Sequence, residues 1–149
     1  MRAVTAISIL IISVVVFSCK KDEPAKTKTD LLTTGSWHVV AYTVDPAIDW
    51  DGDGTDESNV YPVINPCIRD DHTTFFPGGT GELDEGATKC SDSDPQTIAF
   101  AWSFDPSEKG ITVQGVHYLL ETLTETQLVI KEVQVIFTTT YTHTVTFSH

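Results

Sequence analysis

Alternation of apolar and polar residues constrains the fold of this chain more than any other feature of its sequence. From Gly35 onward the dominant period is two. One run covers residues 97–104 and has large apolar side chains at every second position, namely Ile98, Phe100, Trp102 and Phe104. Another run covers residues 140–147, where every second residue is a threonine and the residues between them are Tyr141, His143, Val145 and Phe147. Because a strand projects alternate residues to opposite faces, each run predicts a strand with one core face and one wetter face.

The run after Gly35 is fairly apolar on both parities. Strict alternation would place four residues on one face, namely Trp37, Val39, Ala41 and Thr43, and the residues between them on the other. A short segment before it, Thr29 to Leu32, is the one helical turn that we expect, with Thr29 or Asp30 as its cap.

Turn residues separate the predicted strands at regular intervals. Pro77-Gly78-Gly79 lies between residues 68–76 and 80–87 and predicts a hairpin. Further turns are expected at 105–110 and 124–126, which gives about eight candidate strands in all. Many short strands joined by regular turns indicate an all-β sandwich or barrel, and eight strands can close around a packed interior or a small ligand.

The first residues have the pattern of an export signal. Arg2 precedes an apolar stretch over residues 3–17, which is too short for a bilayer span of about 20 residues. Val16-Phe17-Ser18-Cys19 resembles the lipobox of bacterial lipoproteins, which implies cleavage after residue 18 and lipid on Cys19. An ordinary secreted protein is the alternative. Residues 1–18 are therefore predicted to be a signal peptide, and Cys19 the membrane anchor.

The segment that follows is predicted to be a disordered tether over residues 19–30, ahead of one domain over residues 31–149. It is charged and nearly free of apolar side chains. Lys21-Asp22-Glu23 resembles the signal that sends some Bacteroidota lipoproteins to the outer cell surface. We therefore expect an outer-membrane lipoprotein of the cell envelope, exposed at the surface, with a solvated linker as the alternative interpretation of these charges.

Charge and cysteine content restrict the partners and the compartment. The chain carries 9 Lys and Arg against 21 Asp and Glu, a formal net charge of −12, and such a chain repels nucleic acid. Once Cys19 is assigned to lipid, Cys67 and Cys90 remain as an even pair in an oxidising compartment, which predicts a disulfide across the ends of the 68–87 hairpin. A zinc site is less favoured because no further ligands complete it.

Several segments together resemble a known family. The entry Leu31 to Trp37, with its Gly-x-Trp, resembles that of lipocalins, and the block from Cys67 to Cys90 resembles the lipocalin-like lipoproteins of Bacteroidota. Residues 118–130 resemble their late strand pair. The resemblance implies an eight-stranded antiparallel barrel with a short N-terminal helical turn and a binding role. Lipocalins usually cover the Gly-x-Trp tryptophan with an arginine from the end of the barrel, and this chain has no arginine in its last strands.

An acidic loop is the most chemically loaded stretch of the sequence. Its oxygen-bearing residues follow the spacing of a calcium loop, namely Asp49, Asp51, Asp53, Thr55 and Glu57, with Gly54 at the tight turn. Position 12 of an EF-hand would be Val60 and no helices flank the loop, so a complete EF-hand is excluded. A looser Ca²⁺-binding turn remains, with a solvated acidic turn as the alternative.

No enzyme motif is recognisable, so we do not expect catalysis. The histidines are dispersed, and the adjacent Asp70 and Asp71, if they lie in a strand, would point to opposite faces and could not flank one glycosidic bond. Two functions remain. The first is a monomeric barrel that holds a small apolar or amphipathic ligand among Trp37, Phe100, Trp102, Tyr118 and His143. The second is a surface interaction module that meets protein or glycan through loops such as residues 45–66, with a filled core and a structural calcium loop.

Overall fold

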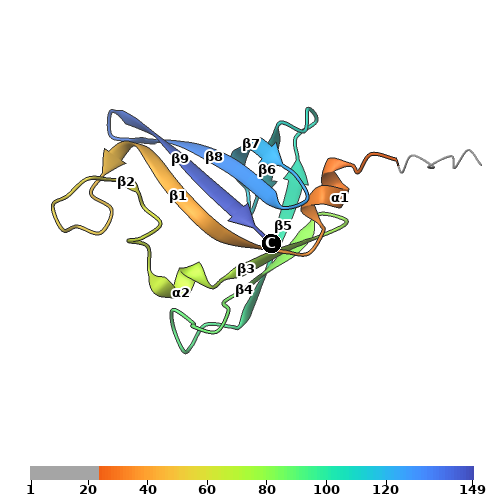
Figure 1. The fold of residues 1–149 in the computed structure, drawn as a ribbon, viewed down its shortest axis with the longest axis horizontal. Coiled ribbons are helices and arrows are strands. Elements are labelled where there is room, and N and C mark those ends of the chain that lie inside the picture. The colour runs from red at the N-terminus through yellow and green to blue at the C-terminus, as the bar shows by residue number, and fades with distance from the viewer. Residues whose placement is uncertain (1–23) are drawn as a thin grey trace, which may run out of the picture.

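The computed structural model describes residues 24–149, which form a barrel of antiparallel strands with two very short helices (Figure 1). The predicted signal peptide, the anchor Cys19 and the Lys21-Asp22-Glu23 signal lie outside the described residues. The helices are α1 (Lys28–Leu32) and α2 (Pro66–Arg69). The strands are β1 (Ser36–Ile48), β2 (Glu57–Asn59), β3 (His72–Phe76), β4 (Thr80–Asp84), β5 (Thr97–Phe104), β6 (Gly110–Val113), β7 (Val116–Leu123), β8 (Gln127–Ile136) and β9 (Thr139–Ser148).

The sheet closes on itself, so the predicted eight-stranded antiparallel barrel is confirmed. The strands follow one another in the order β1-β3-β4-β5-β6-β7-β8-β9, and β9 pairs back onto β1. β3 pairs with β1 only at Ser36 and Trp37, whereas β2 pairs with it further along, from Thr43 to Ile48. The short β2 therefore lies outside the closed ring and continues the edge of β1 that β3 leaves free.

The end of the barrel next to α1 is filled by the main hydrophobic core. Its buried members are Leu32, Trp37, Phe75, Phe100, Trp102, Ile111, Leu128 and Ile130. The fully buried Trp37 donates a hydrogen bond from Nε1 to the Leu32 carbonyl at 2.8 Å, which fixes the end of α1 over the strand entry. We call this the closed end.

Helix α1 begins at Lys28, one residue earlier than the sequence indicates. Thr27 caps it and forms a capping box with Asp30, so the expected cap at Thr29 or Asp30 was wrong. Residues 28–30, assigned to the disordered tether, are helical, and Lys28 Nζ donates to the Glu108 carbonyl. Lys26 forms an ion pair with Glu125 at 2.8 Å. The expectation of disorder up to residue 30 was therefore wrong for residues 28–30.

Strand β1 contains a bulge that changes which residues face the interior. Its register against β9 shifts between Val39 and Ala41. An extra residue in one strand reverses the alternation beyond it. The buried residues of β1 are accordingly Trp37 before the bulge and Val44 after it, not the single parity that strict alternation predicts.

The connection from β2 to β3 is held by the predicted disulfide, Cys67–Cys90, which the structure confirms with a Cα–Cα distance of 5.2 Å. Cys67 does not begin a strand, however. It lies in α2, where the Asn65 side chain accepts from its backbone N–H and Pro66 starts the helical turn. The strand proper begins at His72, and the bond therefore ties α2 to the loop after β4.

Neither helix in the described part of the chain is long and apolar enough to cross a membrane.

Candidate ligand pocket

The interior of the barrel changes from apolar to polar along β8 and β9. Cross-strand partners share a face, and successive interior pairs along these strands are Leu128 with Phe147, Ile130 with Val145, and Glu132 with His143. The first two of these pairs belong to the closed-end core. The third pair places a carboxylate and an imidazole inside the barrel, beyond the core.

A pocket of about 410 Å³ lies against the interior side of β1 and β9, where the segments between β1 and β3 cover the open end of the barrel. Its lining residues come from β1, the acidic loop, the turn before α2, α2 and β9, and they are Val39, Tyr42, Trp50, Ile64, Asn65, Ile68 and Val145. Tyr42 and Asn65 are the polar members of this set; four of the others are aliphatic and the fifth is a tryptophan. A volume in this range and walls of this kind are typical of small-molecule sites.

Two aromatic rings line this pocket, and the buried ring of His143 lies next to both. Tyr42 and Trp50 lie with ring centroids 5.3 Å apart and planes at 70°, and His143 lies 6.0 Å from Tyr42 and 6.2 Å from Trp50. The Tyr42 hydroxyl and His143 Nδ1 are 3.0 Å apart and share a hydrogen bond. His143 is 7% exposed and its Nε2 has no hydrogen-bond partner. The site therefore combines apolar walls with two aromatic rings near a right angle, and a buried histidine with one unpartnered nitrogen lies next to those rings.

Glu132 adds a negative charge to this interior. Burial raises the pKa of Tyr42, and the nearby charge of Glu132 raises it further; burial and Glu132 act in the same way on the pKa of Tyr118. Both phenols are therefore held in their neutral form at physiological pH. No hydrogen bond or ion pair of Glu132 is found among residues 24–149.

The five residues predicted to hold a ligand fall into two groups. Trp37, Phe100 and Trp102 are buried in the closed-end core, and Tyr118 packs against it. Trp102 also donates from Nε1 to the Thr80 carbonyl at 2.8 Å. Only His143 reaches the pocket region, through its contacts with Tyr42 and Trp50. The large aromatics of the strands therefore fill the barrel and do not line the pocket.

Sequence reasoning did not single out the residues that line the pocket. Strict alternation predicted Tyr42 on the face opposite Trp37, which is wrong because of the β1 bulge. Trp50 lies in the acidic loop, where only the oxygen-bearing residues were considered as candidate ligands. Ile64, Asn65 and Ile68 lie in a connection with no regular period. The available signal was the presence of a tryptophan and several isoleucines in an otherwise polar stretch of loop.

The acidic loop stands at the opposite end of the molecule from α1 (Figure 1). Carboxylate oxygens of Asp49, Asp51 and Glu57 lie within 4.8 Å of one another and could hold a metal ion. The Asp49 carboxylate accepts from the backbone N–H groups of Gly52 and Gly54, and Glu57 accepts from the N–H of Trp50 at 3.0 Å. The structure thus brings together three of the five predicted ligands.

Asp53 and Thr55 are not part of that group. The Asp53 carboxylate accepts from the backbone N–H of Thr55 at 2.8 Å, and both residues are exposed. The expected metal set is therefore narrowed to Asp49, Asp51 and Glu57, with a carboxylate from β2 completing it.

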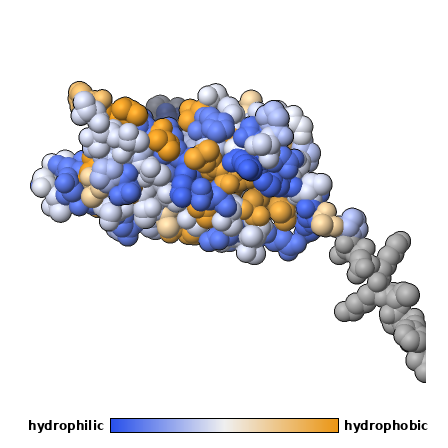
Figure 2. Space-filling model, turned by 90° about the horizontal axis from the view of Figure 1, so that it is seen from above, coloured by the Kyte–Doolittle hydropathy of each residue, from blue (hydrophilic) through white to orange (hydrophobic). Residues whose placement is uncertain are grey.

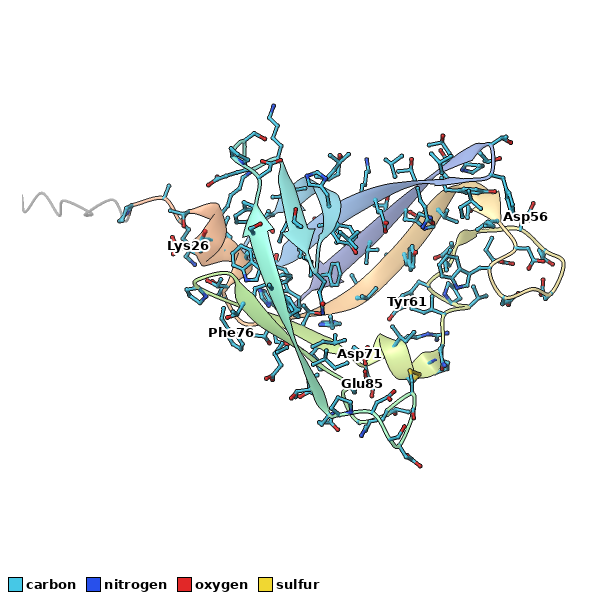
Figure 3. The ribbon with its side chains drawn as sticks, turned by 180° about the vertical axis from the view of Figure 1, so that it is seen from behind. Lys26, Asp56, Tyr61, Asp71, Phe76 and Glu85 are labelled. Atoms are coloured by element: carbon cyan, nitrogen blue, oxygen red, sulfur yellow. A yellow bond between two sulfur atoms is a disulfide. The ribbon has the colours of Figure 1, made fainter. Side chains whose placement is uncertain are left out.

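A second carboxylate group lies beside the disulfide, where Asp71 and Glu85 are labelled in Figure 3. Burial raises the pKa of Asp71 to about 6, helped by the charges of Glu85 and Asp70. The neighbouring Asp70 accepts from the N–H groups of Ala87 and Thr88, both at 2.9 Å. The expectation that Asp70 and Asp71 lie in one strand was wrong, since both precede β3.

Comparisons with models of protein families, with curated protein sequences and with solved structures found no match. The functional assignment therefore rests on the geometry of the pocket and on the chemistry of the sequence.

Proposed function

We propose that this protein is a binding protein that holds a small apolar or amphipathic ligand at the open end of its barrel. The observation that carries the proposal is the pocket of about 410 Å³ between β1, β9 and α2, with almost entirely apolar walls. Removing apolar surface from water is the main source of affinity in such a site. Tyr42 and Asn65 are the polar side chains of the pocket wall that would orient a ligand.

The proposal includes the expected lipid anchor on Cys19 and a lipocalin-like ancestry. In support of the anchor, α1 lies at the end of the barrel opposite the acidic loop (Figure 1). A chain tethered to a membrane through its first residues would then present the pocket end toward solvent. Globomycin treatment, which blocks lipoprotein processing, should leave an uncleaved form of higher mass if Cys19 is the lipidated residue.

The neutral probe N-phenyl-1-naphthylamine tests the binding function, because its fluorescence rises in an apolar site. We expect saturable binding to the parent chain. Ile68→Asp places a charge in the pocket wall at an exposed helical position, so it should weaken binding about 10-fold or more while the chain stays folded. Val133→Asp makes the same change on the outer face of β8 and should bind like the parent. Absence of saturable binding, or equal loss in both variants, would contradict the proposal.

A second candidate function is contact with another protein at the cell surface. The favouring observation is a group of exposed apolar residues on the β8–β9 hairpin, namely Val133, Val135 and Phe137, of which Phe137 is 98% exposed. Apolar patches lie among hydrophilic side chains on the face seen in Figure 2. Photo-cross-linking from position 137 in intact cells should give a discrete adduct that position 114 in the β6–β7 turn does not. Identical patterns from both positions would remove this candidate.

We further propose that Ca²⁺ binds between Asp49, Asp51 and Glu57. Carboxylate oxygens suit this hard cation, and the closeness of the three side chains supports the site. Its expected effect is to order the loop that carries Trp50 over the pocket.

A further inference from the structure

The pocket has the two features that distinguish a site for an organic cation from a site for a neutral or anionic ligand. The first is aromatic. Tyr42 and Trp50 present two pocket walls at 70° to one another, with centroids 5.3 Å apart. A ring face carries partial negative charge and attracts ammonium groups, and rings set at an angle form the aromatic cages that recognise quaternary ammonium ions. Trp50 is 40% exposed, so its surface remains accessible to a ligand.

The second feature is electrostatic. Glu132 faces the barrel interior beside His143, and its charge acts on Tyr42, a pocket-lining residue. The acidic side chains next to Trp50, including Asp49, Asp51 and Glu57, add negative potential at the rim. An ion pair between a ligand cation and these carboxylates would be strengthened by the low dielectric of the pocket.

Among residues 24–149, no basic side chain forms part of the pocket wall. The lining residues include no Lys or Arg. The nearest candidate by sequence, Arg69 of α2, directs its Nη2 to the carbonyls of Pro62 and Ile64 at 2.5 and 3.0 Å, and its guanidinium lies over the Tyr61 ring. A carboxylate or sulfate headgroup would therefore meet no basic side chain in the pocket wall, which disfavours fatty acids and other anionic amphiphiles.

We infer that the ligand of this pocket is an apolar organic cation, an amine or quaternary ammonium compound with a hydrocarbon body, whose charged nitrogen lies against Tyr42 and Trp50. The inference rests on the proposed binding function and specifies its ligand class. The hydrocarbon body would contact Val39, Ile64 and Val145. A quaternary ammonium suits these walls because it needs no hydrogen-bond acceptor.

Three probes with the same hydrocarbon chain separate charge from apolar contact, namely octyltrimethylammonium, 1-octanol and octanoate. Each is titrated into the parent chain by isothermal calorimetry at low ionic strength, without added divalent cations. We expect octyltrimethylammonium to bind about 10-fold more tightly than 1-octanol, and octanoate to bind most weakly. Added salt should reduce the difference in affinity between octyltrimethylammonium and octanoate.

Two variants test the residues named. Trp50→Leu keeps an apolar wall but removes the ring, and Glu132→Gln keeps the shape but removes the charge. Each variant should bind octyltrimethylammonium about five-fold more weakly than the parent, and its affinity for 1-octanol should change by less than about two-fold. Glu82→Gln, on the outward parity of β4, makes the same charge change away from the pocket and is the matched control. It should leave the affinity for all three probes unchanged.

The outcomes separate this inference from the proposed function. Equal or stronger binding of 1-octanol or octanoate would overturn the cation assignment and leave a binding pocket of another class. A cation preference that Glu82→Gln reduces as much as Glu132→Gln would also overturn it, because the preference would then reflect only the net charge. Failure of all three probes to bind would overturn both the inference and the proposed function.

Discussion

At the residue scale, His149 covers the Trp37 ring, a position that an arginine usually takes in the family that the sequence resembles. The His149 ring lies over Trp37, with centroids 3.8 Å apart and planes at 33°. Its Nδ1 is 2.8 Å from the Ser36 carbonyl. A Cβ on Gly35 would stand 3.2 Å from the same ring, and Gly35 has a φ of +79°, so this glycine serves both the turn and the close approach. The absence of an arginine in the last strands therefore leaves Trp37 covered by another side chain.

Replacing His149 tests whether this cover stabilises the closed end. His149→Ala should lower the free energy of unfolding by about 1 kcal/mol, because it removes both the ring contact and the bond to Ser36. His149→Phe keeps the ring and loses only the bond, so it should recover part of that loss. Urea denaturation followed by tryptophan fluorescence measures both. Equal stability of all three proteins would show that the contact contributes nothing.

Asp71 gives a pH dependence whose sign is fixed by its environment. Its pKa in the folded chain is about 6, raised from 3.8 by burial and then by Glu85 and Asp70, while His72 acts in the opposite direction. A raised pKa means that the folded state favours the protonated acid. Stability from this group is therefore complete below about pH 4 and is lost as the pH rises through 6.

Asp71→Asn should accordingly stabilise the protein at about pH 7.5 and have almost no effect at about pH 3.5, where the acid is already protonated in both states. The gain should be about 1 kcal/mol, since the side chain is only partly buried and solvent screens its charge. Melting temperatures at the two pH values measure it. Asp92→Asn, at an exposed loop position, controls for the general relief of negative charge. A gain of equal size at both pH values would contradict the assignment.

At the element scale, the strands of the barrel follow from their alternation, and the pocket does not. Periodicity located β5 and β9 well because each alternates regularly between large side chains on one face and small or polar side chains on the other. It placed Tyr42 wrongly because one inserted residue in β1 reverses the parity, and a bulge has no local signature in a run that is apolar on both faces. The strand expected over residues 68–76 begins only at His72, because Asn65 and Pro66 start a helical turn before it. The pocket needs five segments together, and their juxtaposition follows only from the closed barrel.

The acidic loop gives the prediction that belongs to an element. Millimolar Ca²⁺ should raise the melting temperature, because an ion that binds only the ordered loop stabilises the folded state. Asp51→Asn removes one of the three clustered carboxylates and should abolish most of the rise. Asp53→Asn changes the same charge two residues away, outside the cluster, and should preserve it. An unchanged melting temperature in the parent, or equal loss in both variants, would remove the calcium site.

At the scale of the whole molecule, the two ends of the barrel differ in how much apolar surface they bury. The closed end has eight buried core residues together with α1, whereas the open end has three, namely Val44, Val60 and Ile64. Hydrophobic stabilisation follows the area buried, so the open end should open more readily than the barrel as a whole unfolds. The same end carries the pocket, the acidic loop and α2. Binding and local stability are therefore coupled through the smaller cluster.

Native-state hydrogen exchange tests this division. Amides at the closed end, in β5, the first half of β8, the second half of β9 and β1 near Trp37, should exchange only through global unfolding. Those of β2, the acidic loop and α2 should exchange through smaller openings. Octyltrimethylammonium, or 1-octanol if the cation preference fails, should slow exchange chiefly in this second group, because bound ligand must leave before the open end can separate. Disulfide reduction should speed exchange in α2 more than in β8, since Cys67–Cys90 ties α2 to the loop after β4. Uniform protection across both ends, with or without ligand, would show instead that the barrel unfolds as a single unit and that the pocket has no separate opening motion.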